Sequence, residues 1–210
     1  MLTPIGFSLL RQLSDGAFHS GEDLAAKVGL TRARVSQVLK QAETAGLALE
    51  RIRGRGYRLV AAPDFLDVNE VRKALVEFGA KVAKPGAITP KPQPIIEDDL
   101  GLNAVEPPSG DYSTPALQVE LVDQLDSTST ELLRRSQRRD IHGALLAAEW
   151  QTAGRGRRGR TWTAVAGGSL TFSLGWRFEQ GAGFLAGLSL AIGVAVARAL
   201  EKEGYEGVEL

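Results

Sequence analysis

TRARVSQVLKQAETAG, residues Thr31–Gly46, decides how the first part of this chain folds. Thr31 suits the N-cap position of a helix and Gly46 suits its C-terminal end, so the stretch predicts one helix. Its apolar residues follow the helical repeat and form one core side: Val35, Val38, Leu39 and Ala42. The polar and basic residues on the other side remain available to a partner.

Two helices are predicted before this stretch and a hairpin after it. The apolar residues of 4–13 have helical spacing, and a second helix is capped by Ser20, with Asp23 three residues later, and ends at Gly29. Downstream, LALERIRGRGYRLV (Leu47–Val60) predicts two short strands around a tight turn. Helix, helix, tight turn, helix and hairpin is the order of a winged helix-turn-helix.

This order of elements predicts DNA binding, with the third helix in the major groove. Arginine can bridge guanine edges, and Ser, Thr or Gln can reach phosphates or bases. The candidate DNA-binding residues are Thr31, Arg32, Arg34, Ser36 and Gln37 on the helix, and Arg53 and Arg55 on the wing. Two alternatives stay open: a winged helix that binds protein, and a small helical domain with ordinary solvated arginines.

The distribution of charge indicates two separate anion-binding regions. The 25 basic and 25 acidic residues cancel overall, but residues 1–62 hold nine basic and five acidic ones. Residues 63–126 hold five basic and twelve acidic residues, whereas residues 127–210 hold eleven and eight. Two basic blocks separated by an acidic block favour two anion sites over one uniform surface.

The composition excludes several classes of protein. Without cysteine, the chain has no disulfide framework, cysteine–zinc site or thiol nucleophile. The start, MLTPIGF, lacks the features of a signal peptide, and the longest apolar stretch, Phe184–Ala197, is shorter than the ~18 residues of a membrane span. We therefore expect a soluble, cytoplasmic protein without a membrane partner, and we assign no role to His19 or His142.

A proline-rich stretch separates the first block from the rest. Residues 64–79 predict a connecting helix, and seven of the nine prolines follow between Lys84 and Pro115, with acidic residues and few aromatic ones. Such a composition is typical of an extended linker, with an SH3-type ligand as the alternative. The expected domains are a winged helix over 1–62, a connector with a Pro-rich linker over 63–116, and a second domain over 117–210.

The last block predicts a sheet with helices on it. Strands are expected at Leu117–Leu125, Ala144–Glu149 and Ser169–Phe178. A helix capped by Ser127 or Ser129 follows the first strand, and a long helix is expected over Ala182–Lys202. The predicted fold class is α+β, with a winged helix-turn-helix before an α/β sheet domain.

QTAGRGRRGRTW, Gln151–Trp162, holds four arginines and three glycines within seven residues, between two predicted strands. Three interpretations compete: a nucleic-acid segment of the Arg-Gly type, a solvated loop, and a small-molecule site. A single stretch between apolar strands is unlike an Arg-Gly repeat. Glycines let a loop fold over a ligand, and arginines bind carboxylate and phosphate by forked hydrogen bonds, which favours the small-molecule site.

AEWQTAGRGRRGRTW (Ala148–Trp162) resembles the signature loop of biotin–protein ligases. DSTS, Asp126–Ser129, is similar to the DSTN of that family, and GLSLAIGVAVARALEKEG (Gly187–Gly204) resembles the helix that follows the loop. The N-terminal block, ending in GRGYRL (Gly54–Leu59), resembles the bifunctional members, which also repress the biotin operon. The resemblance covers residues 1–66 and 117–210, which is nearly everything except the Pro-rich stretch.

This resemblance implies a reaction in two steps. Biotin and MgATP give biotinyl-5′-AMP and pyrophosphate, and the biotinyl group then passes to a lysine on the biotin carboxyl carrier domain of a carboxylase. Fixed guanidinium and backbone N–H groups suit the first step, because a carboxylate must attack a phosphate and two anions meet. The resemblance also implies operator DNA as a partner, and a homodimer when the adenylate is bound.

Carried over position by position, the resemblance implies a ligand site without a protein metal site. The implied biotin contacts are Ser127, Thr128, Ser129, Gln151, Arg155, Gly156 and Arg157. The implied catalytic residues are Arg155 and Arg157. The implied residues of the adenylate loop are Gly154, Arg158 and Trp162. For Trp162, a core aromatic is the alternative to packing on the adenine.

The sequence departs from the family pattern in two respects. Ser129 replaces the usual asparagine, which removes an amide donor and acceptor and predicts weaker biotin binding. The family's Lys-Trp-Pro-Asn-Asp motif, a further catalytic lysine and a small C-terminal β-barrel have no counterpart up to Leu210. The resemblance therefore implies a truncated catalytic domain. A DNA-binding, biotin-responsive regulator without ligase activity is the alternative function.

Overall fold

The computed structural model describes residues 2–61, 63–84, 115–156, 159–162, 165–178 and 182–207. The chain divides into two compact units, Met1–Trp176 and Arg177–Leu210. Most of the predicted Pro-rich linker lies outside the described residues, as do Arg157 and Arg158. In the part of the chain that the structure describes, no helix is long and apolar enough to cross a membrane.

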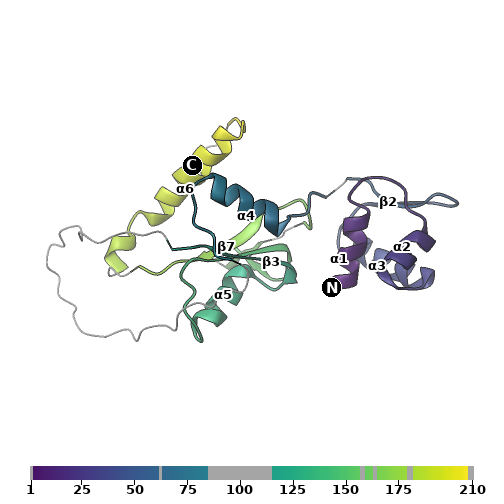
Figure 1. Cartoon of the computed structure of the whole chain (residues 1–210), viewed down its shortest axis with the longest axis horizontal. Coiled ribbons are helices and arrows are strands. Elements are labelled where there is room, and N and C mark those ends of the chain that lie inside the picture. Colours follow the sequence, from purple (N-terminus) through teal and green to yellow (C-terminus); the bar gives the residue numbers. More distant parts are fainter. Residues whose placement is uncertain are drawn as a thin grey trace. The chain divides into compact units, whose positions relative to one another are not determined.

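The first unit begins with three helices and a hairpin, as predicted (Figure 1). These elements are α1 (Pro4–Gln12), α2 (Gly21–Val28), α3 (Arg32–Thr44), β1 (Leu49–Ile52) and β2 (Gly56–Leu59). Helix α2 begins where the Asp23 N–H donates to Ser20 Oγ at 3.0 Å, and it ends at Gly29 with a φ of 65°. Thr31 caps α3 by accepting from the N–H of Arg34 at 3.3 Å. The winged-helix-like order is confirmed.

The hydrophobic core of this part forms around α3. All four predicted core residues of α3, Val35, Val38, Leu39 and Ala42, are buried. The wing is anchored on the α1–α2 connection, where the backbones of His19 and Tyr57 exchange two hydrogen bonds of 2.9 Å. Gly56, beside this anchor, has a φ of 105° and lies directly against the His19 carbonyl group. The wing therefore has a fixed position on the helices.

Helix α4 (Val68–Glu77) follows and is shorter than the predicted helix over 64–79. The reason is its cap: the Asp67 carboxylate accepts from the N–H of Asn69 at 2.7 Å and of Glu70 at 3.2 Å, which starts the helix there. Phe78, which lies within the predicted range, follows the last turn of α4 and is 65% exposed.

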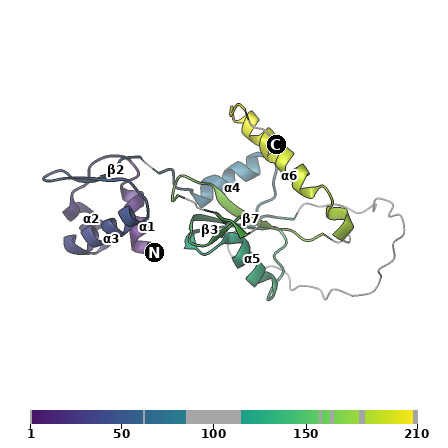
Figure 2. The same cartoon turned by 180° about the vertical axis from the view of Figure 1, so that it is seen from behind.

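A three-stranded sheet forms the second part of this unit, with the order β3-β4-β7. Its strands are β3 (Gln118–Leu125), β4 (Ala144–Gln151) and β7 (Thr171–Gly175), and all three were predicted. Strand β4 runs parallel to β3 and antiparallel to β7. Helices α4 and α5 (Thr128–Ser136) lie on opposite sides of the sheet in both views (Figures 1 and 2). The α+β class is confirmed.

The arginine stretch leaves β4 as a separate two-stranded ribbon. Strand β5 (Gly154–Arg155) pairs with β6 (Thr161–Trp162) in the antiparallel direction. Above this pair, the Gly156 N–H donates to the Arg160 carbonyl at 2.7 Å. The described parts of the arginine stretch, Gly154–Gly156 and Gly159–Trp162, therefore run side by side after the end of β4.

The second unit contains the 3-10 helix η2 (Ala182–Leu185) and the helix α6 (Leu188–Lys202). The sequence predicts one continuous helix over Ala182–Lys202, and this is wrong. Gly187 has a φ of 85°, in the left-handed region, so a new helix has to begin at Leu188. Gly204 follows the end of α6 with a φ of 86°, as expected for a helix stop.

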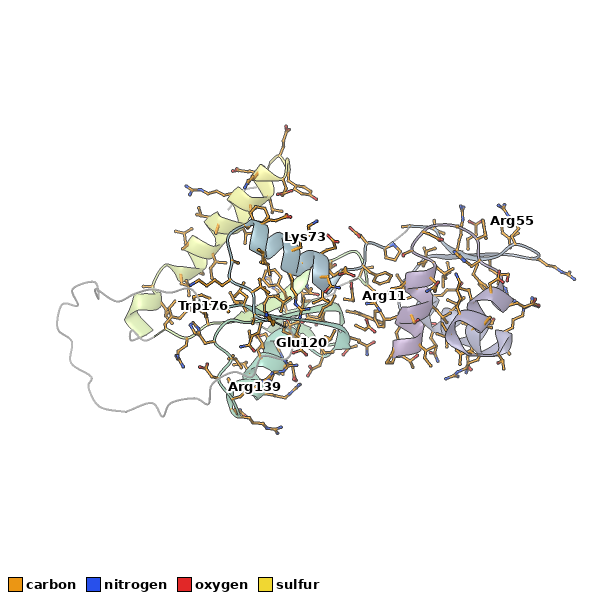
Figure 3. All side chains as sticks on the ribbon, viewed as in Figure 1. Arg11, Arg55, Lys73, Glu120, Arg139 and Trp176 are labelled. Carbon is orange, nitrogen blue, oxygen red and sulfur yellow. The ribbon has the colours of Figure 1, made fainter. Side chains whose placement is uncertain are left out.

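A buried carboxylate links the winged helix to the sheet within the first unit. Glu149 on β4 is 1% exposed, and its Oε1 accepts from the N–H of Leu66 at 2.7 Å. Arg11 of α1, labelled in Figure 3, lies 3.9 Å from the same oxygen and 2.6 Å from Oδ1 of Asp123 on β3. Its guanidinium also stacks on Phe65, 5.3 Å from the ring centre. We call these five residues the junction.

The charge of Glu149 should make stability depend on pH. Desolvation raises the pKa of Glu149 in spite of Leu66 and Arg11. The native state then holds the proton more tightly than the unfolded state, so Glu149 lowers stability as pH rises from the ordinary carboxylate range. We expect Glu149→Gln to raise the free energy of unfolding at pH 7, and the gain to vanish below about pH 4. Urea unfolding across this range measures it.

Glu120→Gln is the matched control, since it removes a carboxylate from the neighbouring strand. The hydrogen bond from Arg135 lowers the pKa of Glu120, so its ionised form stabilises the fold above the ordinary carboxylate range. Glu120→Gln should therefore have a lower free energy of unfolding than the wild type at pH 7, and this difference should disappear on acidification. A Glu149→Gln variant that behaves like this control would contradict the account of the junction.

Candidate functional site

A cavity of about 230 Å³ lies where the carboxyl ends of β3 and β4 meet the ribbon and β7. It is lined by Ser127, Thr128, Ser129, Gln151, Arg155, Trp162, Leu170, Thr171, Phe172 and Ser173. Leu125 and Gln151 are neighbours in the parallel pair, which brings the segments after the two strands together. Six of the ten predicted ligand-site residues therefore share one cavity, although they come from three separate segments.

The polar wall of this cavity is already ordered. Thr128 is 3% exposed, and its N–H donates to Gln151 Oε1 at 2.6 Å. The Thr128 hydroxyl lies 3.1 Å from the same oxygen and 2.8 Å from Ser173 Oγ. Ser127 is equally buried and caps α5, whereas Ser129 is exposed on the first turn of this helix. Hydroxyl and amide groups thus face the cavity in a fixed arrangement.

The turn that carries these hydroxyls is held by Asp126. Its Oδ1 accepts from the N–H of Ser127 at 2.8 Å, and its Oδ2 pairs with Arg134. The hydrogen bond from Ser127, together with Arg134, keeps the pKa of Asp126 below its ordinary value. Asp126 therefore stays ionised at neutral pH and orients the start of α5, without itself lining the cavity.

The ribbon contributes the positive charge of the cavity. Arg155 of β5 and Trp162 of β6 line it, and Trp162 is 56% exposed, so the core-aromatic alternative is wrong. Gly154 is buried, and a Cβ there would lie 2.7 Å from the Trp162 carbonyl oxygen, so the close pairing requires glycine. Gly156 continues the chain at the edge of the described ribbon. Arg157 and Arg158 follow outside the described residues, and their roles stay predictions.

Sequence reasoning missed the contribution of β7. Leu170 and Phe172 form an apolar wall, with exposed fractions of 68% and 50%. Ser173 supplies a hydroxyl to Thr128, and Thr171 donates its hydroxyl to the Ala148 carbonyl at 2.6 Å. The only available signal was two hydroxyl residues within an apolar strand, which is too common a pattern to indicate a ligand.

The predicted DNA-binding residues lie on one accessible region of the winged helix. Thr31, Arg32, Arg34 and Gln37 are exposed, and Ser36 is partly buried. Arg34 donates to Gln37 at 2.6 Å, which aligns the two side chains on α3.

A hollow of about 650 Å³ separates this helix from the wing. Arg32, Arg51 and Arg53 all line this hollow. Arg55, labelled at the wing in Figure 3, stacks 4.5 Å from the Phe18 ring centre. The helix and the wing thus place arginines on either side of one hollow, which Glu22 also lines and where it pairs with Arg32 at 3.6 Å.

Known proteins are similar to this chain over both the winged helix and the sheet with its cavity. Residues 121–210 match the Biotin/lipoate A/B protein ligase family. The bifunctional ligase/repressor BirA of Salmonella typhimurium is 32% identical over 209 residues, which are 99% of this chain and 52% of the relative. Its namesake from Escherichia coli is 30% identical over 206 residues, 98% of this chain and 52% of the relative. The chain is a homologue of these bifunctional ligase/repressors.

A further relative matches a shorter part of the chain at higher identity. The biotin–[acetyl-CoA-carboxylase] ligase of Mycobacterium tuberculosis is 45% identical over 84 residues, which are 38% of this chain and 30% of the relative. The similarity to the ligase/repressors covers nearly the whole chain and therefore includes the winged helix. The chain spans about half the length of these ligase/repressors, so the activity of the whole protein is a matter for proposal.

Proposed function

We propose that this chain carries the biotin-binding part of a biotin–protein ligase, and a winged helix that binds the operator of biotin genes. The proposed domains are the winged helix over 1–62, the connector over 63–116 and the first part of the catalytic domain over 117–210. The observation that carries the proposal is the cavity, in which Thr128, Gln151 and Arg155 converge from separate segments.

The chemistry of the cavity fits the parts of biotin. The urea-like ring of biotin needs both donors and acceptors, which the hydroxyls of Ser127 and Thr128 and the amide of Gln151 can supply. Leu170 and Phe172 offer an apolar wall to the aliphatic chain. Arg155 supplies a guanidinium for the carboxylate, and Ser129 and Gly156 complete the proposed contacts.

In the proposed first step, a carboxylate oxygen of biotin attacks the α-phosphorus of ATP and pyrophosphate leaves. Arg155 and Arg157 lower the repulsion between the two anions and stabilise the charge that develops on the phosphate. In the second step, a carrier lysine attacks the acyl carbon of biotinyl-5′-AMP and AMP leaves.

Magnesium enters this proposal as a companion of ATP. Among the residues that the structure describes, no group of three His, Cys, Asp or Glu side chains could hold a metal ion. We therefore propose that Mg²⁺ arrives on the phosphates of ATP. The hairpin of Gly154, Arg158 and Trp162 would cover the adenylate and exclude water from the reactive anhydride.

The first experiment offers the protein biotin, ATP and Mg²⁺, and measures biotinyl-5′-AMP and biotin on a purified carrier domain by mass spectrometry. Adenylate and transfer together support the ligase. Binding of biotinyl-5′-AMP without its synthesis, together with an adenylate-dependent gel shift on operator DNA, favours the regulator without ligase activity. Sedimentation with and without the adenylate tests the proposed homodimer. If the protein neither synthesises nor binds biotinyl-5′-AMP, both proposals are wrong.

The wing offers a separate test of DNA binding. Arg53→Gln should weaken binding to all DNA sequences about equally and lower the slope of log K against log salt by about 1, because one phosphate contact is lost. Lys27→Gln removes an exposed cation from α2 and serves as the control. Equal salt slopes for both variants would remove Arg53 from the proposed interface. Fluorescence anisotropy at several salt concentrations gives the slopes.

A further inference from the structure

A second cavity, of about 310 Å³, lies at the opposite ends of β3 and β4 from the first one. Its floor is made by the first residues of both strands, and its walls come from α4, α5 and the segments that follow these helices. The apolar part of the lining includes Val119, Leu132, Leu145 and Leu146. None of its lining residues belongs to the proposed biotin site.

Positive charge gathers at this cavity. Arg72 of α4, Lys84 after it, Arg135 of α5 and Arg139 after α5 all line it. Figure 3 labels Arg139 together with Glu120 on β3, the only carboxylate in the lining that the structure describes. Four cations from distant parts of the chain thus face one acid, and their mutual repulsion opposes this arrangement.

Both oxygens of this carboxylate, Glu120, accept hydrogen bonds from one of these cations, Arg135. Arg135 holds Glu120 with two hydrogen bonds of 2.5 and 3.0 Å, and its Nε donates to Glu131 at 2.8 Å. Arg135 is therefore a fixed part of the wall. In the described residues, no ion pair joins Arg72, Lys84 or Arg139 to a carboxylate.

Arg72, which lines the cavity, also has a buried donor that lacks an acceptor among the described residues. One end of its guanidinium donates to the Val119 carbonyl at 2.9 Å, which fixes the side chain at the cavity wall. Its Nε is buried and has no hydrogen-bond partner among the described residues. A buried charged donor without an acceptor costs free energy, and the charge of an anion beside the guanidinium would offset part of this cost.

We propose that this cavity binds a small phosphorylated molecule. Arg72, Lys84 and Arg139 would bind the phosphate, since three cations that have no carboxylate partner among the described residues match a dianion better than a monoanion. The apolar floor of Val119 and Leu145, which are neighbours in the parallel pair and share one face of the sheet, would contact the organic part of the ligand. This site is separate from the biotin cavity and does not depend on the function proposed for it.

The test uses the whole chain and two-dimensional ¹H–¹⁵N NMR, with phenyl phosphate, inorganic phosphate and benzoate as probes at equal ionic strength. We expect phenyl phosphate to shift the backbone amides of Val119, Leu132 and Leu145 in a saturable manner. Benzoate should bind more weakly because it carries one charge. Inorganic phosphate that binds as tightly as phenyl phosphate would overturn the role of the apolar floor.

Single substitutions locate the site. Arg139→Gln and Arg72→Gln should each weaken the binding of phenyl phosphate about tenfold, as expected for the loss of one charge-assisted contact. Arg138→Gln is the matched control, because Arg138 is exposed next to Arg139 but does not line the cavity. Arg72→Lys keeps the charge and removes the Nε donor, so it should also bind more weakly.

Three results would overturn the proposal. The amide shifts could fail to saturate, Arg138→Gln could weaken binding as much as Arg139→Gln, or the shifts could fall on Thr128 and Ser173. The first two results would show diffuse attraction to a basic surface. The third would place the anion in the biotin cavity. Arg139 is exposed, so its variant stays informative even if Arg72→Gln disturbs the fold.

Discussion

Arg155→Gln should lower the rate of biotinyl-5′-AMP formation about 100- to 1000-fold, the range expected when a group that stabilises transition-state charge is lost. Arg155 is the only cation among the described residues that line the biotin cavity. Glutamine keeps hydrogen-bonding ability but removes the charge that lets a carboxylate approach a phosphate. The rate is measured in single turnovers with saturating biotin and MgATP.

Arg160→Gln is the control for this experiment. Arg160 belongs to the same hairpin and is exposed, but it does not line the cavity. We expect its variant to stay within about threefold of the wild-type rate, as for a peripheral charge. If Arg155→Gln behaves like this control, Arg155 has no catalytic role. If the wild-type chain forms no adenylate, the same pair is compared by affinity for biotinyl-5′-AMP, with a loss of about tenfold or more expected for Arg155→Gln.

Gly56→Ala should destabilise the winged helix by more than about 3 kcal/mol and abolish operator binding. A Cβ at Gly56 would lie 1.9 Å from the backbone oxygen of His19, and the φ of 105° is itself unfavourable for alanine. The wing can relieve the clash only by breaking the two hydrogen bonds between His19 and Tyr57. Thermal unfolding and DNA binding measure the two effects.

Gly54→Ala provides the matched control on the same wing. Gly54 also has a positive φ, of 84°, but nothing lies within 4 Å of the added Cβ. Its variant should therefore lose only about 1 kcal/mol, the cost of the backbone conformation alone. Equal losses at Gly54 and Gly56 would show that the anchor to His19 does not hold the wing. Biotin binding should survive in both variants, because the biotin cavity lies in the sheet part of the unit.

Short-range features were predictable because the residues that decide them are close in sequence. Ser20 and Thr31 start α2 and α3 through hydrogen bonds that span three residues. An imperfect alternation over Leu117–Leu125 and a short apolar run over Ala144–Glu149 indicated two of the three strands. The hydroxyl segment at Ser127 and the arginine hairpin were identified through a resemblance, and the structure places both at one cavity.

Long-range features could not be predicted, because they depend on how strands and helices are placed. Thr128 and Gln151 are 23 residues apart and meet only through the register of β3 and β4. Leu66 and Glu149 are separated by 83 residues. The break at Gly187 was missed for another reason, since glycine also occurs within helices and its backbone conformation cannot be read from a single sequence.

Within three residues, strand β4 makes hydrogen bonds to two different parts of the molecule. Glu149 accepts a hydrogen bond from the backbone N–H of Leu66, just after the winged helix. Gln151 accepts one from the N–H of Thr128 at the proposed biotin cavity. A winged helix grafted from another protein would leave Glu149 and Asp123 without Arg11. Chimeras of this protein should therefore be more stable when the incoming winged helix carries an arginine at the position of Arg11, so the winged helix is not a freely exchangeable module.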